Sequence, residues 1–362
     1  MSKIFNITFI TNSIGFGGAS KMLRFVATEL AKRGHNVSII NRNSIYRNNN
    51  KSMPVSSEIT YYSIKENSRF SEIKKILEIA KSEKSDVLIG FTEEPNMYAK
   101  IVGTLLNIPS IMSERGDPER TNGRRGWKNK IVMSIIDKSK GAVFQTEGAS
   151  KFYAKGLQKR GMIIPNPIFI AGDISNVLQT EREKTVVSVS RFDNSQKRYD
   201  VMLKAFKIFS ETHPEYILKL YGKGPDEEQI KTWVKELDIE DKVKFMGLTL
   251  SPMQDICRDG MFIITSDYEG IPNALLEAMA TGLPCVATDC TPGGARLLIQ
   301  DHQNGLLAPI GDYEKVAKAL GEFADNPELA ASCGEKAKDV INRFAPSRII
   351  DMWENYISNI LK

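Results

Sequence analysis

The sequence predicts an α/β protein of two Rossmann-like domains, each built on a parallel β-sheet, with a cleft between them. Three observations support this fold class. The chain has 362 residues, more than one hydrophobic core usually covers. Strand-like apolar runs alternate with helical patterns along nearly the whole length, which implies right-handed crossovers between parallel strands. One polar, proline-containing stretch interrupts this alternation near the middle, and the alternation then starts again.

The first half of the chain begins with an apolar strand and an amphipathic helix. The helix is expected over residues 19–34, where the apolar residues recur at helical spacing and Gly34 ends the pattern. The strands expected in this half are residues 4–10, 36–42, 86–91, 109–114 and 141–146.

The interruption covers residues 161–184, where Pro165 and Pro167 bracket Asn166 and a polar segment follows. Prolines next to polar residues are typical of a linker between domains. We therefore expect a first domain at 1–166 and a second at 167–345.

The second half repeats the alternation of strands and helices. Its expected strands are residues 185–191, 216–222, 242–247, 261–266, 284–289 and 304–309. A final amphipathic helix is expected over 346–362, after the break at Pro346, and it is expected to pack back on the first domain.

Composition and cysteine usage narrow the class of protein. Hydrophobic residues make up 41% of the chain, and no run approaches the roughly 18 apolar residues of a membrane span. The net charge of +5 is modest, so nucleic acid is not an expected partner. The N-terminus enters a strand directly, without the pattern of a cleaved leader. Four cysteines without a Cys-x-x-Cys pair suggest reduced thiols, and together these features predict a cytoplasmic protein.

Two glutamates mark the most informative stretch, "SDYEGIPNALLEAMATG" at 266–282. Glu277 stands within an apolar helical run, where a buried carboxylate would need a partner. Glu269 belongs to a tight loop that leads to Asn273, a residue suited to cap the helix. A surface location is the usual reading for a helical glutamate, but these neighbours favour a ligand site.

The spacing of the two carboxylates suggests contact with one elongated ligand. A glycosidase pair stands about 5–10 Å apart, whereas eight residues of helix span about 12 Å, so the spacing disfavours such a pair without excluding it. The N-terminus of the helix between the glutamates offers free N–H groups to a phosphate. A nucleoside diphosphate sugar has the matching shape.

The stretch "EGIPNALLEAMATGLPCVATD" resembles the Glu-x7-Glu signature of retaining GT-B glycosyltransferases, the large group 1 family of polysaccharide and glycolipid assembly. The resemblance covers nearly the whole chain. It implies that Glu277 binds the ribose of the donor and that Glu269 lies beside the donor sugar. It also implies that the backbone of the following loop holds the sugar and the phosphate, through Gly270, Ile271, Pro272 and Asn273.

The segment "SVSRFDNSQKRYDVML" resembles the Arg…Lys segment of the same family, which assigns Arg191 and Lys197 to the donor diphosphate. Arginine can clamp a phosphate with two hydrogen bonds, and lysine adds a point charge. On a polar loop without this context, both residues would more often be solvated. The resemblance further places the backbone of Gly247 and Leu248 against the base of the nucleotide.

A glycine-containing loop, "TNSIGFGGAS", joins the first strand to the first helix. Gly17 and Gly18 allow a close approach of backbone to an anion, although such loops also serve as plain turns. The dinucleotide fingerprint is incomplete, because Ser20 replaces its third glycine and no acidic residue ends the second strand. Arg42 could serve a phosphorylated ribose, so an NADP-linked oxidoreductase stays open.

The acceptor side is expected in the first domain. In the glycosyltransferase reading, the Gly17–Gly18 loop approaches the donor diphosphate and the acceptor, and Glu114 and Arg115 join it. Many relatives carry a histidine where this chain has Arg115, so the identity of the sugar is left open. The segment 115–130 carries six basic and two acidic residues, a balance of +4, which suits either a solvated loop or an anionic acceptor or membrane surface. Trp127 could anchor that segment at an interface.

The sequence therefore predicts a retaining transferase that moves a sugar from a nucleotide sugar, with UDP expected, to a saccharide or lipid-linked saccharide. No metal site is expected, because there are three histidines, His35 is expected to be structural, no Asp-x-Asp motif occurs, and enzymes of this type need no metal. No other cofactor is expected. Peripheral association with the cytoplasmic face of a membrane is compatible with the basic segment. The alternatives are a sugar-nucleotide epimerase of the same fold and a non-catalytic protein that binds nucleotide sugars.

Overall fold

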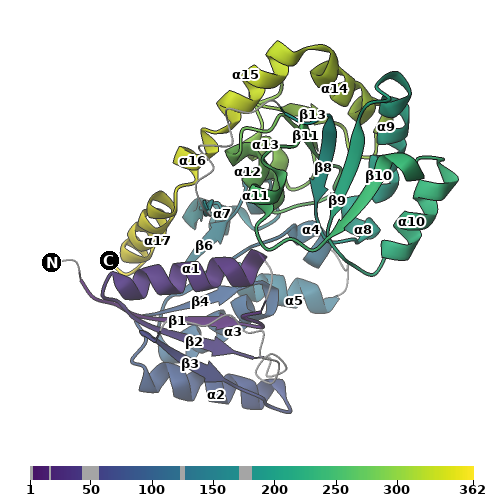
Figure 1. The fold of residues 1–362 in the computed structure, drawn as a ribbon. Helices are drawn as coiled ribbons and strands as arrows, with labels where there is room; N and C mark the ends of the chain where they lie inside the picture. Colours follow the sequence, from purple (N-terminus) through teal and green to yellow (C-terminus); the bar gives the residue numbers. More distant parts are fainter. Residues whose placement is uncertain (1–2, 16–17, 43–56, 123–126, 171–181) are drawn as a thin grey trace. The chain divides into compact units, whose positions relative to one another are not determined.

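The computed structural model describes residues 3–15, 18–42, 57–122, 127–170 and 182–362. It divides the chain into two compact units (Figure 1). Unit 1 consists of residues 1–167 together with 346–362, and unit 2 consists of residues 168–345. The break between the units falls one residue from the boundary that the proline-containing stretch suggests.

In the described part of unit 1, seven parallel strands form one sheet in the order β3-β2-β1-β4-β5-β6-β7. These strands are β1 (Asn6–Thr11), β2 (Asn36–Asn41), β3 (Ile59–Ser63), β4 (Val87–Phe91), β5 (Ser110–Ser113), β6 (Gly141–Phe144) and β7 (Gly161–Ile163). The central strand β4 is buried along its whole length, as expected for a strand with helices on both faces of its sheet.

The helices of unit 1 cover both faces of this sheet. They are α1 (Gly18–Lys32), α2 (Arg69–Ser82), α3 (Glu93–Leu106), α4 (Pro118–Asn122), α5 (Trp127–Ile136), α6 (Glu147–Lys151), α7 (Lys155–Arg160) and α17 (Pro346–Ile360). Successive residues of β1 enter different cores: Phe9 packs with α1 and α17, and Ile10 packs with α2 and α3. The period-two alternation of the strand thus builds two apolar layers.

The last helix completes the core of the first unit. Figure 1 shows α17, in yellow, beside α1, in purple, although the two helices lie at opposite ends of the chain. Trp353 is fully buried and stacks on Phe91 with 5.9 Å between the ring centroids. Arg33 at the end of α1 forms ion pairs with Asp351 and Glu354 of α17.

Unit 2 contains a second sheet, in which six parallel strands of the described chain follow the order β10-β9-β8-β11-β12-β13. These strands are β8 (Thr185–Val189), β9 (Ile217–Tyr221), β10 (Val243–Gly247), β11 (Met261–Ile264), β12 (Cys285–Thr288) and β13 (Leu306–Ala308). The prediction of two parallel-sheet domains is therefore confirmed.

The helices of unit 2 also form two layers. One core contains residues of α9, α10 and α14, and the other contains residues of α11, α12, α13 and α16. The elements are α8 (Asn194–Lys197), α9 (Tyr199–Thr212), α10 (Glu227–Glu236), the 3-10 helix η3 (Glu240–Lys242), α11 (Pro252–Ile256), α12 (Asn273–Ala280), α13 (Gly294–Leu298), α14 (Tyr313–Asp325), α15 (Pro327–Ala337) and α16 (Val340–Arg343).

Each sheet has one point where the strand order reverses. In unit 1 the chain adds β2 and β3 on one side of β1, and then β4 and the later strands on the other side. In unit 2 the same reversal falls between β8 and β11. Ligands of open α/β sheets bind outside the carboxyl ends of the strands at such a point, so the loops after β8 and β11 are the first place to look for a site.

Candidate functional site

The loops that follow β8 and β11 are joined by hydrogen bonds at the reversal point of unit 2. Asp267 donates its backbone N–H to the carbonyl oxygen of Gln196 at 2.9 Å. The Gln196 side chain donates to the carbonyl oxygen of Tyr268 at 3.0 Å. Residues expected to contact the donor therefore lie on two loops that the fold brings together.

Glu269 occupies the centre of this cluster, with 8% of its surface exposed. Its carboxylate accepts from the Lys197 ammonium group and from the Ser266 hydroxyl, the latter at 2.9 Å. Gln196 Nε2 lies 3.4 Å from the other carboxylate oxygen, Oε2. These contacts from three side chains fix the direction of the Glu269 carboxylate.

The two expected diphosphate ligands differ in their surroundings. Lys197 at the end of α8 is half-buried and forms the ion pair with Glu269. The side chain of Arg191 is 62% exposed and pairs with Asp193 on the same loop. Each cation thus contacts a carboxylate within unit 2. A diphosphate bound at this place would have to displace that carboxylate from the cation.

Helix α12 begins beside Glu269 and carries Glu277. Asn273 was expected to cap this helix, but it is the first helical residue, and Pro272 occupies the cap position without a side-chain cap bond. The prediction that Asn273 is the N-cap of this helix is therefore wrong. Glu277 is half-buried between the buried residues Leu276 and Ala278.

Close backbone packing brings to the site a third loop, which was not predicted from the sequence. Glu269 donates its N–H to the carbonyl oxygen of Thr291 at 2.7 Å. A Cβ at Gly294 would stand 2.0 Å from the carbonyl oxygen of Gly270, so only glycine fits where α13 begins. The signal was present in the sequence as the adjacent pair Gly293 and Gly294.

Gly247 and Leu248, expected beside the base, lie at the carboxyl end of the edge strand β10. Gly247 has a φ of +76°, which favours glycine at this position. Its carbonyl oxygen accepts from the N–H of Gly222 at 2.8 Å. The Leu248 side chain is 70% exposed, so an apolar group stands at this end of the sheet.

The glycine-containing loop of unit 1 lies partly outside the described residues, and Gly17 is among those not described. Gly18 begins α1, and Ser20 donates to the carbonyl oxygen of Ser13 at 3.0 Å. The Arg24 guanidinium donates to the carbonyl oxygen of Gly15 at 2.9 Å. The loop is therefore braced from within α1, and Ser20 has a structural role where the dinucleotide fingerprint has glycine.

Glu114 and Arg115 follow β5 and are both buried. Glu114 accepts from the backbone N–H groups of Arg115 and Gly116 and from the Tyr153 hydroxyl, and burial raises the pKa of its carboxyl group. Arg115 donates from Nε to the Ser113 hydroxyl at 2.7 Å.

The Arg115 guanidinium lies over the rings of Phe91 and Trp353, at 5.4 and 5.3 Å from their centroids. Its Nη2 has no hydrogen-bond partner among the described residues. Burial lowers the pKa of Arg115 to about 9, against the opposite effect of the Glu114 charge. The arginine is thus held within the core of unit 1, next to α17.

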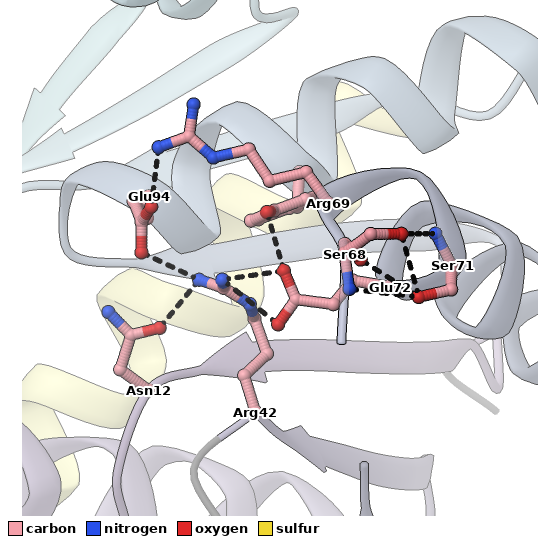
Figure 2. Close-up of polar contacts among 8 residues, drawn as sticks. Asn12, Arg42, Ser68, Arg69, Ser71, Glu72 and Glu94 are labelled. Atoms are coloured by element: carbon pink, nitrogen blue, oxygen red, sulfur yellow. Dashed lines mark hydrogen bonds and ion pairs between the residues drawn. The ribbon is translucent and has the colours of Figure 1, made fainter. Parts of the chain in front are cut away.

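Both terminal nitrogens of the Arg42 guanidinium donate to side chains of unit 1, as Figure 2 shows. Its guanidinium donates to both carboxylate oxygens of Glu72, at 3.2 and 2.9 Å, and to Glu94 at 3.1 Å. Asn12 accepts from the same group at 2.7 Å, and the ring of Tyr98 lies 4.0 Å away. Because two carboxylates already neutralise Arg42, the structure disfavours a role for it in binding a phosphorylated ribose.

The basic segment 115–130 is described only in part, since residues 123–126 and the side chain of Lys128 lie outside the description. Trp127 begins α5 and its side chain is 69% exposed. Ile131, one turn further along α5, is 51% exposed. An aromatic and an aliphatic side chain therefore reach the surface of unit 1 close to exposed Lys130.

Among the described residues, no three histidine, cysteine, aspartate or glutamate side chains gather in a way that could hold a metal ion. None of the described helices combines the length and the apolar character needed to cross a membrane.

Residues 173–340 match the family model described as "Glycosyl transferases group 1". The chain is 29% identical to an uncharacterized glycosyltransferase of Haemophilus influenzae, over 96% of this chain and 98% of that one. It is 27% identical, over 98% of both chains, to a Campylobacter jejuni α-1,4-N-acetyl-D-galactosaminyltransferase, whose name specifies GalNAc-α-(1→4)-GalNAc-α-(1→3)-diNAcBac-PP-undecaprenol.

Among solved structures, Anabaena HepE in complex with UDP matches with a TM-score of 0.82 and 17% identity, over 98% of this chain and 99% of that one. A likeness at this identity bears on the fold alone. It agrees with the GT-B prediction of two parallel-sheet Rossmann-like domains, which is confirmed.

Proposed function

We propose that this chain is a glycosyl transferase of group 1 and that it transfers a sugar from a UDP-sugar with retention of anomeric configuration. The match to the family model and the full-length relatives support this proposal. The acceptor is a saccharide or a lipid-linked saccharide. The UDP bound to HepE supports the choice of nucleotide, and the name of the Campylobacter relative supports the class of acceptor.

The observation that carries the proposal is the cluster at the reversal point of unit 2. Lys197, Glu269 and the start of α12 come together there. This arrangement supplies a cation, a directed carboxylate and the N-terminus of a helix at one place. A diphosphate and the hydroxyls of its attached sugar require these three kinds of contact.

In the proposed reaction, the bond between the anomeric carbon and the β-phosphate oxygen breaks, and a bond from that carbon to an acceptor oxygen forms on the same face. The acceptor proton passes to the leaving phosphate. Arg191, Lys197 and the N–H groups of α12 stabilise the charge that develops on the diphosphate. Glu269 orients the sugar and Glu277 holds the ribose, while the backbone of Gly247 and Leu248 lies against the base.

We assign the acceptor to unit 1, beside the carboxyl ends of its strands. In the sequence, Gly17 and Gly18 come after β1, and Glu114 and Arg115 come after β5. We assign the segment 115–130 to an anionic acceptor or to the anionic surface of a membrane. The exposed side chains of Trp127 and Ile131 support this assignment. The proposal places the enzyme in the cytoplasm, at the inner face of the membrane.

The test incubates the purified chain with single UDP-sugars and with synthetic saccharides, both free and linked to a lipid diphosphate. Mass spectrometry identifies a product that is heavier by one sugar, and NMR of that product reports the anomeric configuration. An inverted product contradicts the retaining mechanism. Because the diphosphate charge is assigned to Arg191, Lys197 and α12, activity should persist in a metal chelator, and its complete loss there contradicts that assignment.

Two alternative functions are outcomes of the same experiment. Conversion of the donor without any acceptor identifies a sugar-nucleotide epimerase. Binding of UDP-sugars with neither transfer nor conversion across the acceptor panel identifies a non-catalytic binding protein.

A further inference from the structure

We propose that Arg198 is a positioning residue for this reaction, which holds the Lys197 loop against the Glu269 loop. The inference rests on the proposed function, because it concerns the same site. Arg198 itself contacts neither Lys197 nor Glu269 through its side chain in the described contacts; its effect passes through the two loops.

The backbone of Arg198 adopts a left-handed conformation, with φ 52° and ψ 55°. It forms the junction at which α8 ends and α9 begins, directly after Lys197. A residue with a Cβ is disfavoured in this conformation, and glycine is the residue that adopts it without cost. An arginine at this junction therefore requires a compensating contribution from its side chain.

The guanidinium supplies that contribution through two aspartates. Nε and Nη2 donate to the two carboxylate oxygens of Asp200, each at 2.9 Å. Nη1 donates to both oxygens of Asp267, at 2.9 and 3.1 Å. Asp200 belongs to α9, whereas Asp267 belongs to the loop after β11, so the side chain of Arg198 links the two loops of the site.

The backbones of the same two loops are joined at the same point. Thr265 donates its hydroxyl to the carbonyl oxygens of Lys197 and Arg198, at 2.9 and 3.1 Å. Asp267 donates its N–H to Gln196 at 2.9 Å. Residues 196 to 198 are therefore tied to residues 265 to 267 by both backbone and side chain.

The link lies next to both groups that the proposed reaction uses. Lys197 immediately precedes Arg198, and Glu269 follows Asp267 by two residues. When the Arg198 side chain is removed, the junction after Lys197 loses its charged contact with the Asp267 loop. Lys197 and Glu269 should then sample positions away from the donor, and small displacements of reacting groups slow an enzyme strongly.

Arg198→Gly is the decisive variant, because glycine keeps the left-handed backbone and removes only the side-chain link. Asp267→Asn removes the same link from the opposite loop. Asp238→Gly is the matched control: Asp238 also has a positive φ, of 54°, and follows α10 in the same unit. Arg198→Lys keeps the positive charge but cannot form the paired hydrogen bonds to Asp200 and Asp267. Its kcat should therefore lie between that of Arg198→Gly and that of the wild type.

Two measurements are made on the full chain. Steady-state kinetics with a UDP-sugar and its acceptor give kcat and KM, and hydrogen exchange with mass spectrometry covers the peptides that contain 194–203 and 262–270. We expect kcat to fall by about 10- to 100-fold in Arg198→Gly and Asp267→Asn. Exchange should accelerate in both peptides, including at the amide of Asp267. Asp238→Gly should keep the wild-type kcat and wild-type exchange in these peptides.

The outcomes separate this inference from the proposed function. Wild-type kcat and wild-type exchange in Arg198→Gly and Asp267→Asn overturn the positioning role. A reduced kcat that Asp238→Gly shares also overturns it, because the effect then follows from the glycine and not from the link. If the wild-type chain transfers no sugar while exchange accelerates in the two link variants, the proposed function fails and the link between the loops stands.

Discussion

Lys197 and Glu269 lie 72 residues apart in the chain, and their side chains form an ion pair where the loops after β8 and β11 meet. The pair joins the residue expected on the diphosphate to the residue expected beside the sugar. A phosphate that approaches Lys197 must therefore compete with Glu269. Substitutions at the two positions should consequently have opposite effects on the binding of a free nucleotide.

The first prediction concerns the two cations. Arg191→Ala and Lys197→Ala should each weaken the binding of UDP by about 1.5–3 kcal/mol, because each loses a charge-assisted hydrogen bond to phosphate. Calorimetry measures the affinity. Lys207→Ala is the control, since Lys207 is paired with Glu211 on α9 of the same unit. Wild-type affinity in both site variants contradicts the assignment.

The second prediction concerns the two glutamates. Glu277→Gln should weaken UDP binding, because its proposed partner is the ribose. Glu269→Gln should bind UDP as tightly as the wild type or more tightly, because Lys197 loses its competing carboxylate, but transfer should fall. Calorimetry and a transfer assay are run on both variants. An equal loss of UDP affinity in the two variants would show that they do not contact different parts of the donor.

The fold was largely predictable because most strands of the two sheets are buried on both faces and read as apolar runs. Strand β3 was missed, because this edge strand, ITYYS, is only partly buried. Strand β7 was assigned to the linker, because it has three residues and ends two residues before Pro165. Short edge strands carry little of the pattern that identifies a strand.

The site was only partly predictable. Resemblance to a family brought Glu269 and Lys197 to attention, but the contacts of Gln196 and Ser266 with Glu269 depend on loops that are distant in sequence. For Arg42 the sequence position was misleading, because a position after β2 suggested that it binds a phosphorylated ribose. The carboxylates that neutralise it come from α2 and α3, which sequence spacing alone does not place beside it.

The third prediction concerns the Arg42 cluster. Arg42→Ala should lower the free energy of unfolding by about 3–5 kcal/mol, because the largely buried carboxylate of Glu72 loses its positively charged partner and keeps the Tyr98 hydroxyl as a donor. Urea unfolding measures the change. Arg69→Ala should change it by less than about 1 kcal/mol, because Arg69 is 72% exposed and contacts only the partly exposed Glu94 in the described ion pairs. Tight binding of NADPH that Arg42→Ala abolishes would instead favour the oxidoreductase.

The fourth prediction concerns pH and Arg115. Because burial lowers its pKa to about 9, below the value in the unfolded chain, the folded state binds fewer protons above pH 9. The cost of the buried charge is therefore complete at neutral pH and is relieved as the pH rises through 9. The unfolding free energy of Arg115→Met relative to that of the wild type should therefore be most favourable at neutral pH, where the wild type bears the full cost of the buried charge.

This difference in unfolding free energy should shrink between pH 8 and pH 10, measured by denaturant unfolding of both proteins. Arg69→Met, which replaces an exposed arginine of the same unit, should show no such change with pH. A difference that widens over this range contradicts the effect of burial on Arg115.

The fifth prediction concerns the basic segment. Replacing Arg124, Arg125 and Lys128 with glutamate should reduce sedimentation with anionic liposomes and transfer to a lipid-linked acceptor, more strongly at low salt than at high salt. Each basic residue near an anionic surface contributes about 1 kcal/mol, and salt screens that contribution. UDP affinity should not change, because the donor is assigned to unit 2.

The control for this experiment makes the same change of charge at exposed positions elsewhere in unit 1, namely Lys65, Lys74 and Lys81. Equal losses in the two triple variants would mean that total charge matters and that the segment has no specific role. Unchanged sedimentation and unchanged acceptor kinetics would favour a soluble acceptor.

The packing of α17 against α1 makes unit 2 an insertion within unit 1, because the first unit is built from both sides of the second in the sequence. During synthesis at the ribosome, the core around Phe91 stays open until Trp353 has emerged, after unit 2 is already complete. A chain that stops near residue 345 would lack α17. Unit 1, most of which precedes unit 2 in the sequence, would then lose part of its core. A gene that joins residues 346–362 directly behind residue 167 contains all the segments of unit 1 and gives a way to produce that unit on its own.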